Sequence, residues 1–329
     1  MISTTVHNTG SKMPLAWSFT AIIGAFVLGE TARFLLKKII PRRSPHHHYV
    51  GELISSFEFS AGVFEIAVIG KYYSKLLGFI CSFTFLFLKN SEYILDRKAA
   101  NPCGLLEGIV RRDVRRSWVV DFVTKVSSQL TGALLAFPFM KLVWQSTASE
   151  IHFIQLSRGL SSSLEVSVLV GFAIEITATF VLTMIDFLTR GGLRKFNPLV
   201  RAGACVLICY ALTGTTGVWM NPVFATVHTF LFTDAKEDIL EHFFVFWIAP
   251  IFGTLIAIAT DSKLHEPERK PPPIAKTILK KLKKHPVSNE PASQDGKATN
   301  GKIYGKANGV SVSNTKARQR KTNYGAAKE

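Results

Sequence analysis

Long apolar stretches recur along the first 260 residues of this chain, and short segments rich in charged residues separate them. A membrane-spanning helix needs about 20 mostly apolar residues, and seven windows meet this requirement: 15–36, 49–70, 74–95, 118–143, 164–189, 199–216 and 240–260. Acidic and basic residues interrupt the second and third windows. Because charged side chains in a bilayer are costly unless they face protein or water, the pattern predicts an all-α membrane protein whose helices surround a polar path.

Lysine and arginine are concentrated in alternate connections, after the first, third, fifth and seventh windows. Cytosolic loops are enriched in these residues, so we expect the N-terminus to face the lumen or exterior and the C-terminus to face the cytosol. The first basic cluster follows its apolar stretch and does not precede it. This order favours a retained transmembrane helix over a cleaved signal peptide.

Two similar segments divide the apolar region into halves. Glu52 begins the segment ELISSF, and Glu175 begins the segment EITATF. An Asn-Pro pair follows 49 residues after the first glutamate and 46 residues after the second, at Asn101 and Asn221. Three predicted spans separate the two glutamates, so we expect two repeats with opposite orientations in the membrane.

The Asn-Pro pairs at Asn101 and Asn221 are each followed by an apolar stretch too short to cross a bilayer. Proline suits the first helical position, because its missing N–H has no partner there, and so Pro102 and Pro222 are predicted to start two half-helices. Asn101 and Asn221 would then be N-caps beside the positive ends of the helix dipoles. Their amides could bind a passing solute, which predicts a pore for small neutral molecules.

The segments at 101–104 (NPCG) and 216–222 (TGVWMNP) resemble the two loop motifs of the aquaporin family. The first resembles the Asn-Pro-Cys variant of the divergent branch called superaquaporins. The resemblance covers about residues 15–260 and implies an inverted repeat of three helices plus a half-helix, preceded by one additional N-terminal transmembrane helix. The expected parts are an N-terminal helix with a basic connection at 1–48, repeats at 49–145 and 146–261, and a tail at 262–329.

This resemblance also implies a function, an assembly and a location. We expect a passive channel for water and small neutral solutes, with glycerol and hydrogen peroxide as candidates, and a homotetramer. We expect a multi-pass protein of an intracellular membrane such as the endoplasmic reticulum, with the plasma membrane as the alternative. The sequence contains no catalytic or cofactor-binding motif that competes with this interpretation, so we expect neither an enzyme nor a cofactor.

The resemblance assigns roles to individual residues. Those expected at the pore midplane are Asn101, Pro102, Cys103, Asn221, Pro222 and Val223. Those expected at the constriction are Phe224, Cys209, Val218 and Cys81. Glu52 and Glu175 are expected to support the two loops by accepting hydrogen bonds from backbone amides. For Cys103 the alternative to lining the pore is packing against neighbouring helices.

Two positions depart from the family pattern. Val223 stands where the second motif usually has alanine, and Phe224 stands where orthodox members have an arginine that lines the narrowest part of the pore. A guanidinium supplies five hydrogen-bond donors and a fixed charge, so its loss changes what the pore can select. The alternative function is a non-conducting membrane scaffold with the same fold, plugged at Phe224.

The charge of the chain lies largely in its tail. The net charge is +16, and residues 262–329 hold 16 basic and 5 acidic residues. No basic patch interleaved with aromatic residues occurs outside the tail, so we expect no nucleic-acid binding. Residues 274–284 are predicted to form a basic amphipathic helix for an anionic lipid surface or a calmodulin-like partner. The four cysteines lack the spacing of a metal site.

Overall fold

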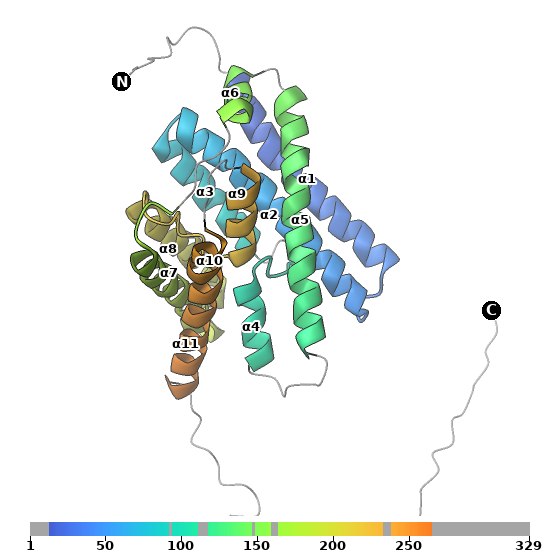
Figure 1. Cartoon of the computed structure of the whole chain (residues 1–329). Helices are drawn as coiled ribbons and strands as arrows, with labels where there is room; N and C mark the ends of the chain where they lie inside the picture. The colour runs from blue at the N-terminus through green and yellow to red at the C-terminus, as the bar shows by residue number, and fades with distance from the viewer. Residues whose placement is uncertain are drawn as a thin grey trace, which may run out of the picture. The chain divides into compact units, whose positions relative to one another are not determined.

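The structure is a computed structural model that describes residues 13–91, 94–110, 118–146, 149–158, 164–232 and 238–264. All regular structure in these residues is helical (Figure 1), which confirms the predicted all-α class. The helices are α1 (Met13–Ile39), α2 (Pro45–Tyr72), α3 (Lys75–Asn90), α4 (Pro102–Val110), α5 (Trp118–Ser146), α6 (Glu150–Arg158), α7 (Val168–Leu188), the 3₁₀ helix η1 (Gly191–Phe196), α8 (Asn197–Ala211), α9 (Pro222–Phe232), α10 (Ile239–Phe243), the π-helical turn η2 (Phe244–Ile248) and α11 (Ala249–Leu264).

Five helical stretches among the described residues are long and apolar enough to cross a membrane: α1 from Leu15, α2, α5, α7 and the continuous run from α10 to α11. The other two predicted windows contain shorter helices, since α3 has 16 residues and α8 has 15. At the end of α3, the Asn90 amide donates to the Leu86 carbonyl at 2.8 Å, and the Ser91 hydroxyl donates to the Leu88 carbonyl at 2.6 Å. These bonds use carbonyls that the end of a helix leaves without partners.

The short helices α4 and α9 are exchanged between the two repeats. Helix α4 follows α3 in the chain but packs against α11, and α9 follows α8 but packs against α5. Within each repeat the long helices make close pairs, α2 with α5 and α7 with α11. A Cβ atom at Gly132 would lie 2.2 Å from the Leu53 carbonyl oxygen, and one at Gly253 would lie 2.5 Å from the Ile176 carbonyl oxygen. Glycine at matching places therefore permits both close contacts.

The additional helix α1 lies along α2 (Figure 1) and is joined to it by a buried ionic cluster. The Arg33 guanidinium of α1 donates to the Glu58 carboxylate of α2. Lys89 Nζ of α3 lies 3.0 Å from Glu58 Oε2, and all three side chains are buried. Removing one member would leave an uncompensated buried charge, which is strongly destabilising. Glu58 and Lys89, which interrupt the second and third windows, therefore face protein here.

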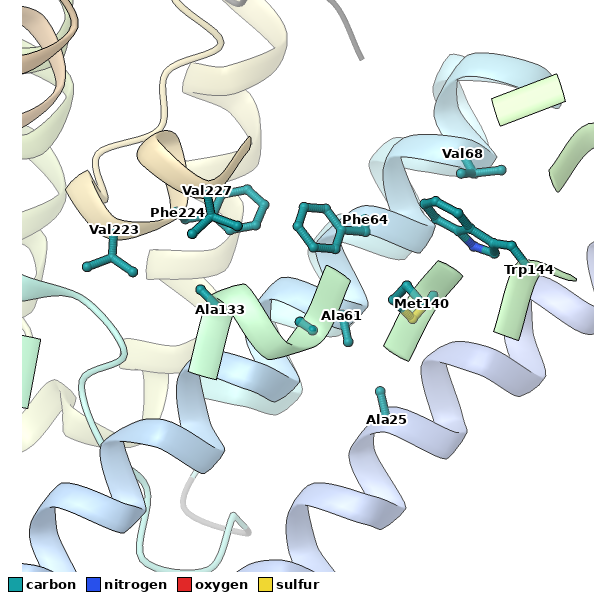
Figure 2. Packing of buried hydrophobic residues seen from close by; sticks show 11 residues of the cluster. Ala25, Ala61, Phe64, Val68, Ala133, Met140, Trp144, Val223, Phe224 and Val227 are labelled. Carbon is teal, nitrogen blue, oxygen red and sulfur yellow. The ribbon is translucent and has the colours of Figure 1, made fainter. Parts of the chain in front are cut away.

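Buried apolar side chains connect α9 to α2 and α5 (Figure 2). Phe224 and Val227 lie on the side of α9 nearest Phe64 of α2 (Figure 2), and Val223 belongs to the same buried cluster. Residues of the first repeat and of the second half-helix thus share one core, and this packing holds α9 against α2 and α5.

The predicted basic amphipathic segment at 274–284, with all of the tail beyond Leu264, lies outside the described residues. The domain boundaries at 48, 145 and 261 stay predictions.

Candidate functional site

The Asn-Pro pairs at Asn101 and Asn221 start helices α4 and α9. Pro102 and Pro222 occupy the first helical positions, where proline has no N–H to leave unpaired. The Asn101 Oδ1 atom accepts a hydrogen bond from the Cys103 amide at 2.9 Å. Asn221 Oδ1 accepts one from the Phe224 amide at 3.4 Å. Each asparagine therefore caps its own helix through its side-chain oxygen.

The side-chain nitrogens of the two asparagines reach across to the opposite repeat. Asn101 Nδ2 donates to the Met220 carbonyl at 2.8 Å, and Asn221 Nδ2 donates to the Ala100 carbonyl at 2.9 Å. Each acceptor is the residue directly before the other asparagine. These reciprocal bonds bring the starts of α4 and α9 together, so the structure places both motifs at one point.

Ala100 and Met220 adopt an unusual backbone conformation, with φ angles of 50° and 49°. This left-handed region costs a non-glycine residue roughly 1–2 kcal/mol. Such strain persists where surrounding contacts fix the backbone, and here those contacts are the asparagine amide of the other repeat and a buried acid. Because alanine and methionine carry no signal for a positive φ, the sequence analysis did not single out these two residues.

The buried acids Glu52 and Glu175 hold the same two backbone positions. Glu52 Oε2 accepts from the Ala100 amide at 3.0 Å and from Gln129 Nε2 at 2.8 Å. Gln129 is a polar residue within the fourth apolar window, and that anomaly could have drawn attention to it.

Glu175 accepts hydrogen bonds from one more donor than Glu52. Its Oε1 accepts from the Thr216 hydroxyl at 2.8 Å and the Trp219 amide at 3.0 Å, and its Oε2 accepts from the Met220 amide at 2.9 Å. The Thr216 hydroxyl also accepts from the Val218 amide at 3.0 Å. The carboxylate therefore holds the backbone amides of Trp219 and Met220 directly, and that of Val218 through the Thr216 hydroxyl.

A cavity of about 720 Å³ opens onto this point. Asn101, Cys103 and Asn221 are among the residues that line it, together with Trp219 and Phe59. Cys103 is buried and also belongs to the cavity lining, so it packs against neighbouring helices and forms part of the cavity wall. The arrangement presents two asparagine side chains and a helix N-terminus to any solute that enters.

Val223 and Phe224 do not line this cavity. Val223 is completely buried, in the core shared by α2, α5 and α9. The Phe224 ring is 2% exposed, and its centroid lies 5.4 Å from the Phe59 ring, 5.5 Å from the Phe64 ring and 5.1 Å from the Trp219 ring. Figure 2 shows this ring between α9 and α2. Phe59 and Trp219 line the cavity, so Phe224 lies behind these two side chains and does not contact the cavity itself.

The other three residues expected at the constriction do not belong to the buried cluster that contains Phe224. Cys209 Sγ donates to the Val218 carbonyl at 3.6 Å, and both residues belong to a cluster between α7, α8 and the loop before α9. Cys81 is a half-buried free cysteine on α3 and does not belong to that cluster. The structure brings Cys209 and Val218 together but does not join all four side chains in one described cluster.

Comparison with known proteins gives one consistent family. The sequence profile described as Major intrinsic protein matches residues 101–260. A Caenorhabditis elegans protein named as aquaporin-10 is 29% identical over 238 residues, which cover 70% of this chain and 80% of that protein. Aquaporin-11 of Rattus norvegicus is 21% identical over 228 residues, covering 68% and 82%.

A solved structure has the same fold. The X-ray structure of the aquaglyceroporin from Plasmodium falciparum superposes with a TM-score of 0.51 at 17% identity, covering 68% of this chain and 98% of that one. At this identity the similarity concerns the fold, and the site must be argued from its own residues.

Proposed function

Since this chain is a divergent member of the aquaporin family, we propose that it is a passive channel for water and small neutral solutes. The observation that carries the proposal is the reciprocal pair of bonds between each asparagine amide and the loop of the opposite repeat. A carboxamide nitrogen carries two N–H donors. One donor of each asparagine holds the loops together, and the second is the group that we assign to a permeating solute.

Charge at the same point supports exclusion of cations. The N-terminus of each half-helix carries a partial positive charge from the helix dipole, and the two termini converge here. A dipole of this kind repels a cation on the axis, whereas it only orients a neutral polar solute. Water and glycerol therefore fit the proposed path better than an ion.

The finer features of the proposal come from the family resemblance. We assign the protein to a homotetramer in an intracellular membrane such as the endoplasmic reticulum or in the plasma membrane, with a cytosolic C-terminus. The midplane residues are Asn101, Pro102, Cys103, Asn221, Pro222 and Val223, and the residues proposed near the constriction are Phe224, Cys209, Val218 and Cys81.

One observation favours the second candidate, a non-conducting scaffold. Phe224 is packed tightly by Phe59, Phe64 and Trp219, and an apolar aromatic layer can exclude water from a narrow path. In the channel proposal this layer is a narrow neck beside which solute passes. In the scaffold proposal it is a permanent plug.

Water and glycerol flux distinguish the two candidates. Purified full-length protein is reconstituted into phosphatidylcholine vesicles, and light scattering follows their shrinkage after mixing with sorbitol and their reswelling after mixing with glycerol. The channel proposal predicts faster shrinkage than in empty vesicles, with a lower activation energy. Equal rates in loaded and empty vesicles for both solutes, with folded protein recovered from the vesicles, would leave the scaffold as the function.

A further inference from the structure

A buried histidine joins the first turn of α2 to the segment that precedes α4. His47 is 1% exposed, whereas its neighbours His46 and His48 are exposed. Its Nδ1 atom lies 2.9 Å from the Ile40 carbonyl oxygen, and its Nε2 atom contacts Asp96 Oδ2. One imidazole ring therefore connects the turn after α1, the start of α2 and a segment that lies 49 positions further along the chain.

Both ring nitrogens of His47 face hydrogen-bond acceptors. A carbonyl oxygen has no proton to donate, and neither has a carboxylate. A neutral imidazole carries one N–H, so it would donate to one of these acceptors and turn a lone pair toward the other, whereas an imidazolium donates to both. The geometry therefore requires one proton more than a neutral histidine and a carboxylate hold together.

This additional proton belongs to the ring and not to Asp96. Burial acts to raise the pKa of Asp96, but hydrogen bonds from His47 and Lys98 outweigh it and hold that pKa below its usual value. Lys98 Nζ lies 3.1 Å from Asp96 Oδ1, so each oxygen of the carboxylate faces a donor. Asp96 is therefore a carboxylate at neutral pH, and the imidazole carries the proton.

The other charged and titratable groups around this contact have partners of their own or face solvent. They are His46, His48, Tyr49 and Glu52 in α2, Lys98 before α4, Asp121 and Lys125 in α5, and Lys37, Lys38, Arg42 and Arg43 at the end of α1 and in the turn after it. Glu52 accepts hydrogen bonds from Ala100 and Gln129, and Asp121 pairs with Lys125 at 2.7 Å. The four basic residues around the turn are exposed. Among the described residues, Asp96 is therefore the carboxylate that bonds to His47.

Asp96 begins the segment that leads into the first half-helix. Residues 97–101 line the cavity. Asp96 has a φ angle of 45°, and a non-glycine residue keeps such a conformation where surrounding contacts fix it. Those contacts are His47 and Lys98, while Glu52 holds the other end of the segment. The histidine contact thus fixes one end of a strained stretch that forms part of the cavity wall.

We propose that His47 is a positioning residue whose protonation clamps residues 96–100 to the start of α2, and that the clamp opens as the pH rises. The sign follows from the proton count, because the clamped state binds one proton more than a released state with a neutral ring. Loss of that proton turns a lone pair toward an acceptor, and Asp96 is then free to leave the left-handed region.

Nitrogen NMR of full-length protein in nanodiscs, with 15N-labelled histidine, tests the protonation state. The chain has nine histidines, and His47→Gln identifies the His47 signals by their loss. At about pH 6.5 we expect both ring nitrogens of His47 to be protonated. At about pH 7.5 the protonated fraction should fall about threefold or more in Asp96→Asn, because the charged acceptor is lost. A neutral His47 ring at the lower pH, or equal protonation in the parent and Asp96→Asn, would overturn the proposal.

Hydrogen exchange tests whether this proton holds the segment in place. The reporter is the peptide that contains Ala100, whose amide donates to Glu52, and rates are corrected for the intrinsic effect of pH. The matched control for His47→Gln is His46→Gln, which removes the adjacent exposed histidine. In the parent and the control we expect exchange to be about tenfold faster at about pH 8.5 than at about pH 6.5, since release is linked to one proton.

In His47→Gln the same peptide should exchange fast at both pH values. If this variant does not fold, Asp96→Asn takes its place, because Asp96 is half-buried and lies outside the helices. One pH profile shared by the parent, His46→Gln and His47→Gln would contradict the clamp, since a merely structural histidine leaves that profile unchanged.

A change in solute flux is a separate outcome. Residues 97–101 line the cavity in front of the two half-helix starts, so release of the segment should make vesicle flux depend on pH in the parent and not in His47→Gln. This consequence rests on the proposed function, whereas the NMR and exchange measurements do not. Absence of flux in every variant would therefore count against the channel, and a neutral His47 would count against the clamp.

Discussion

The starts of α4 and α9 have the same backbone scaffold but different surroundings. In both, an asparagine caps the helix, the preceding residue has a positive φ, and a buried glutamate accepts a hydrogen bond from that residue's amide. Beyond that scaffold the two differ. The start of α4 faces an open cavity, whereas the first turn of α9 is buried in an aromatic cluster.

This difference separates two requirements on the sequence. The matched network fixes the backbone where the repeats meet, and it needs asparagine and glutamate at both places. The side chain that follows the second motif takes no part in this network, and here it is the Phe224 ring, which packs against Phe59, Phe64 and Trp219. The two helix starts therefore share one backbone network, while the side chains beside them differ.

The largest expected effect concerns the two acids. Glu175→Gln should destabilise the protein more than Glu52→Gln, because Glu175 accepts three hydrogen bonds and Glu52 accepts two. Bonds to a charged acceptor contribute about 1.5–3 kcal/mol each, and glutamine turns one acceptor into a donor. Thermal unfolding in detergent measures the order, with the exposed Glu150→Gln as control. An equal or larger loss for Glu52→Gln would show that the two loops are not anchored as described.

The next prediction concerns the aromatic layer. Phe224→Ala should destabilise the protein by roughly 3–5 kcal/mol, as removal of a buried phenyl group does, while water and glycerol flux are retained or increased. Phe224→Arg should reduce glycerol flux more than water flux, because a guanidinium narrows the path and adds donors. Vesicle swelling measures both fluxes. A large gain in water flux for Phe224→Ala over an inactive parent would instead identify a plug and support the scaffold.

The asparagines give a third test. Asn221→Asp places a carboxylate where the two helix N-termini converge and partly cancels the potential that opposes cations. We expect cation leakage to rise in vesicles loaded with a potassium-sensitive dye, or assembly to fail. Asn101→Asp is the comparison, and it should disturb folding less because Asn101 is less buried than Asn221. Parental solute and cation fluxes in a folded Asn221→Asp variant would remove this residue from the path.

The smallest effect concerns backbone strain. Met220→Gly should be more stable than Met220→Ala by about 1 kcal/mol, because both lose the same buried contacts but glycine adopts a positive φ without penalty. Denaturation midpoints of the two variants in one detergent give the difference. If Met220→Ala is the more stable of the two, the left-handed conformation at this position is not costly.

Much of the fold could be predicted from the pattern of apolar residues. The all-α class, the additional first helix and the helix starts at Pro102 and Pro222 all depend on residues close together in the chain. The lengths of α3 and α8 were less predictable, because side-chain bonds such as that of Asn90 to the Leu86 carbonyl end a helix inside an apolar window. At the site, the asparagines and glutamates could be predicted from the repeated motifs, whereas Ala100 and Met220 could not, because their side chains carry no signal for a positive φ.

The sequence by itself determined the apolar windows, the repeat and the residues able to cap a half-helix, because hydrophobic periodicity and capping act over a few residues. Tertiary structure decided the rest. The bonds that join the two loops link residues 119 and 121 positions apart, and packing of α9 against α2 and α5 put Phe224 behind the cavity wall. The contact between His47 and Asp96, 49 positions apart, likewise follows from how the chain packs, since no local pattern specifies which of three adjacent histidines is buried.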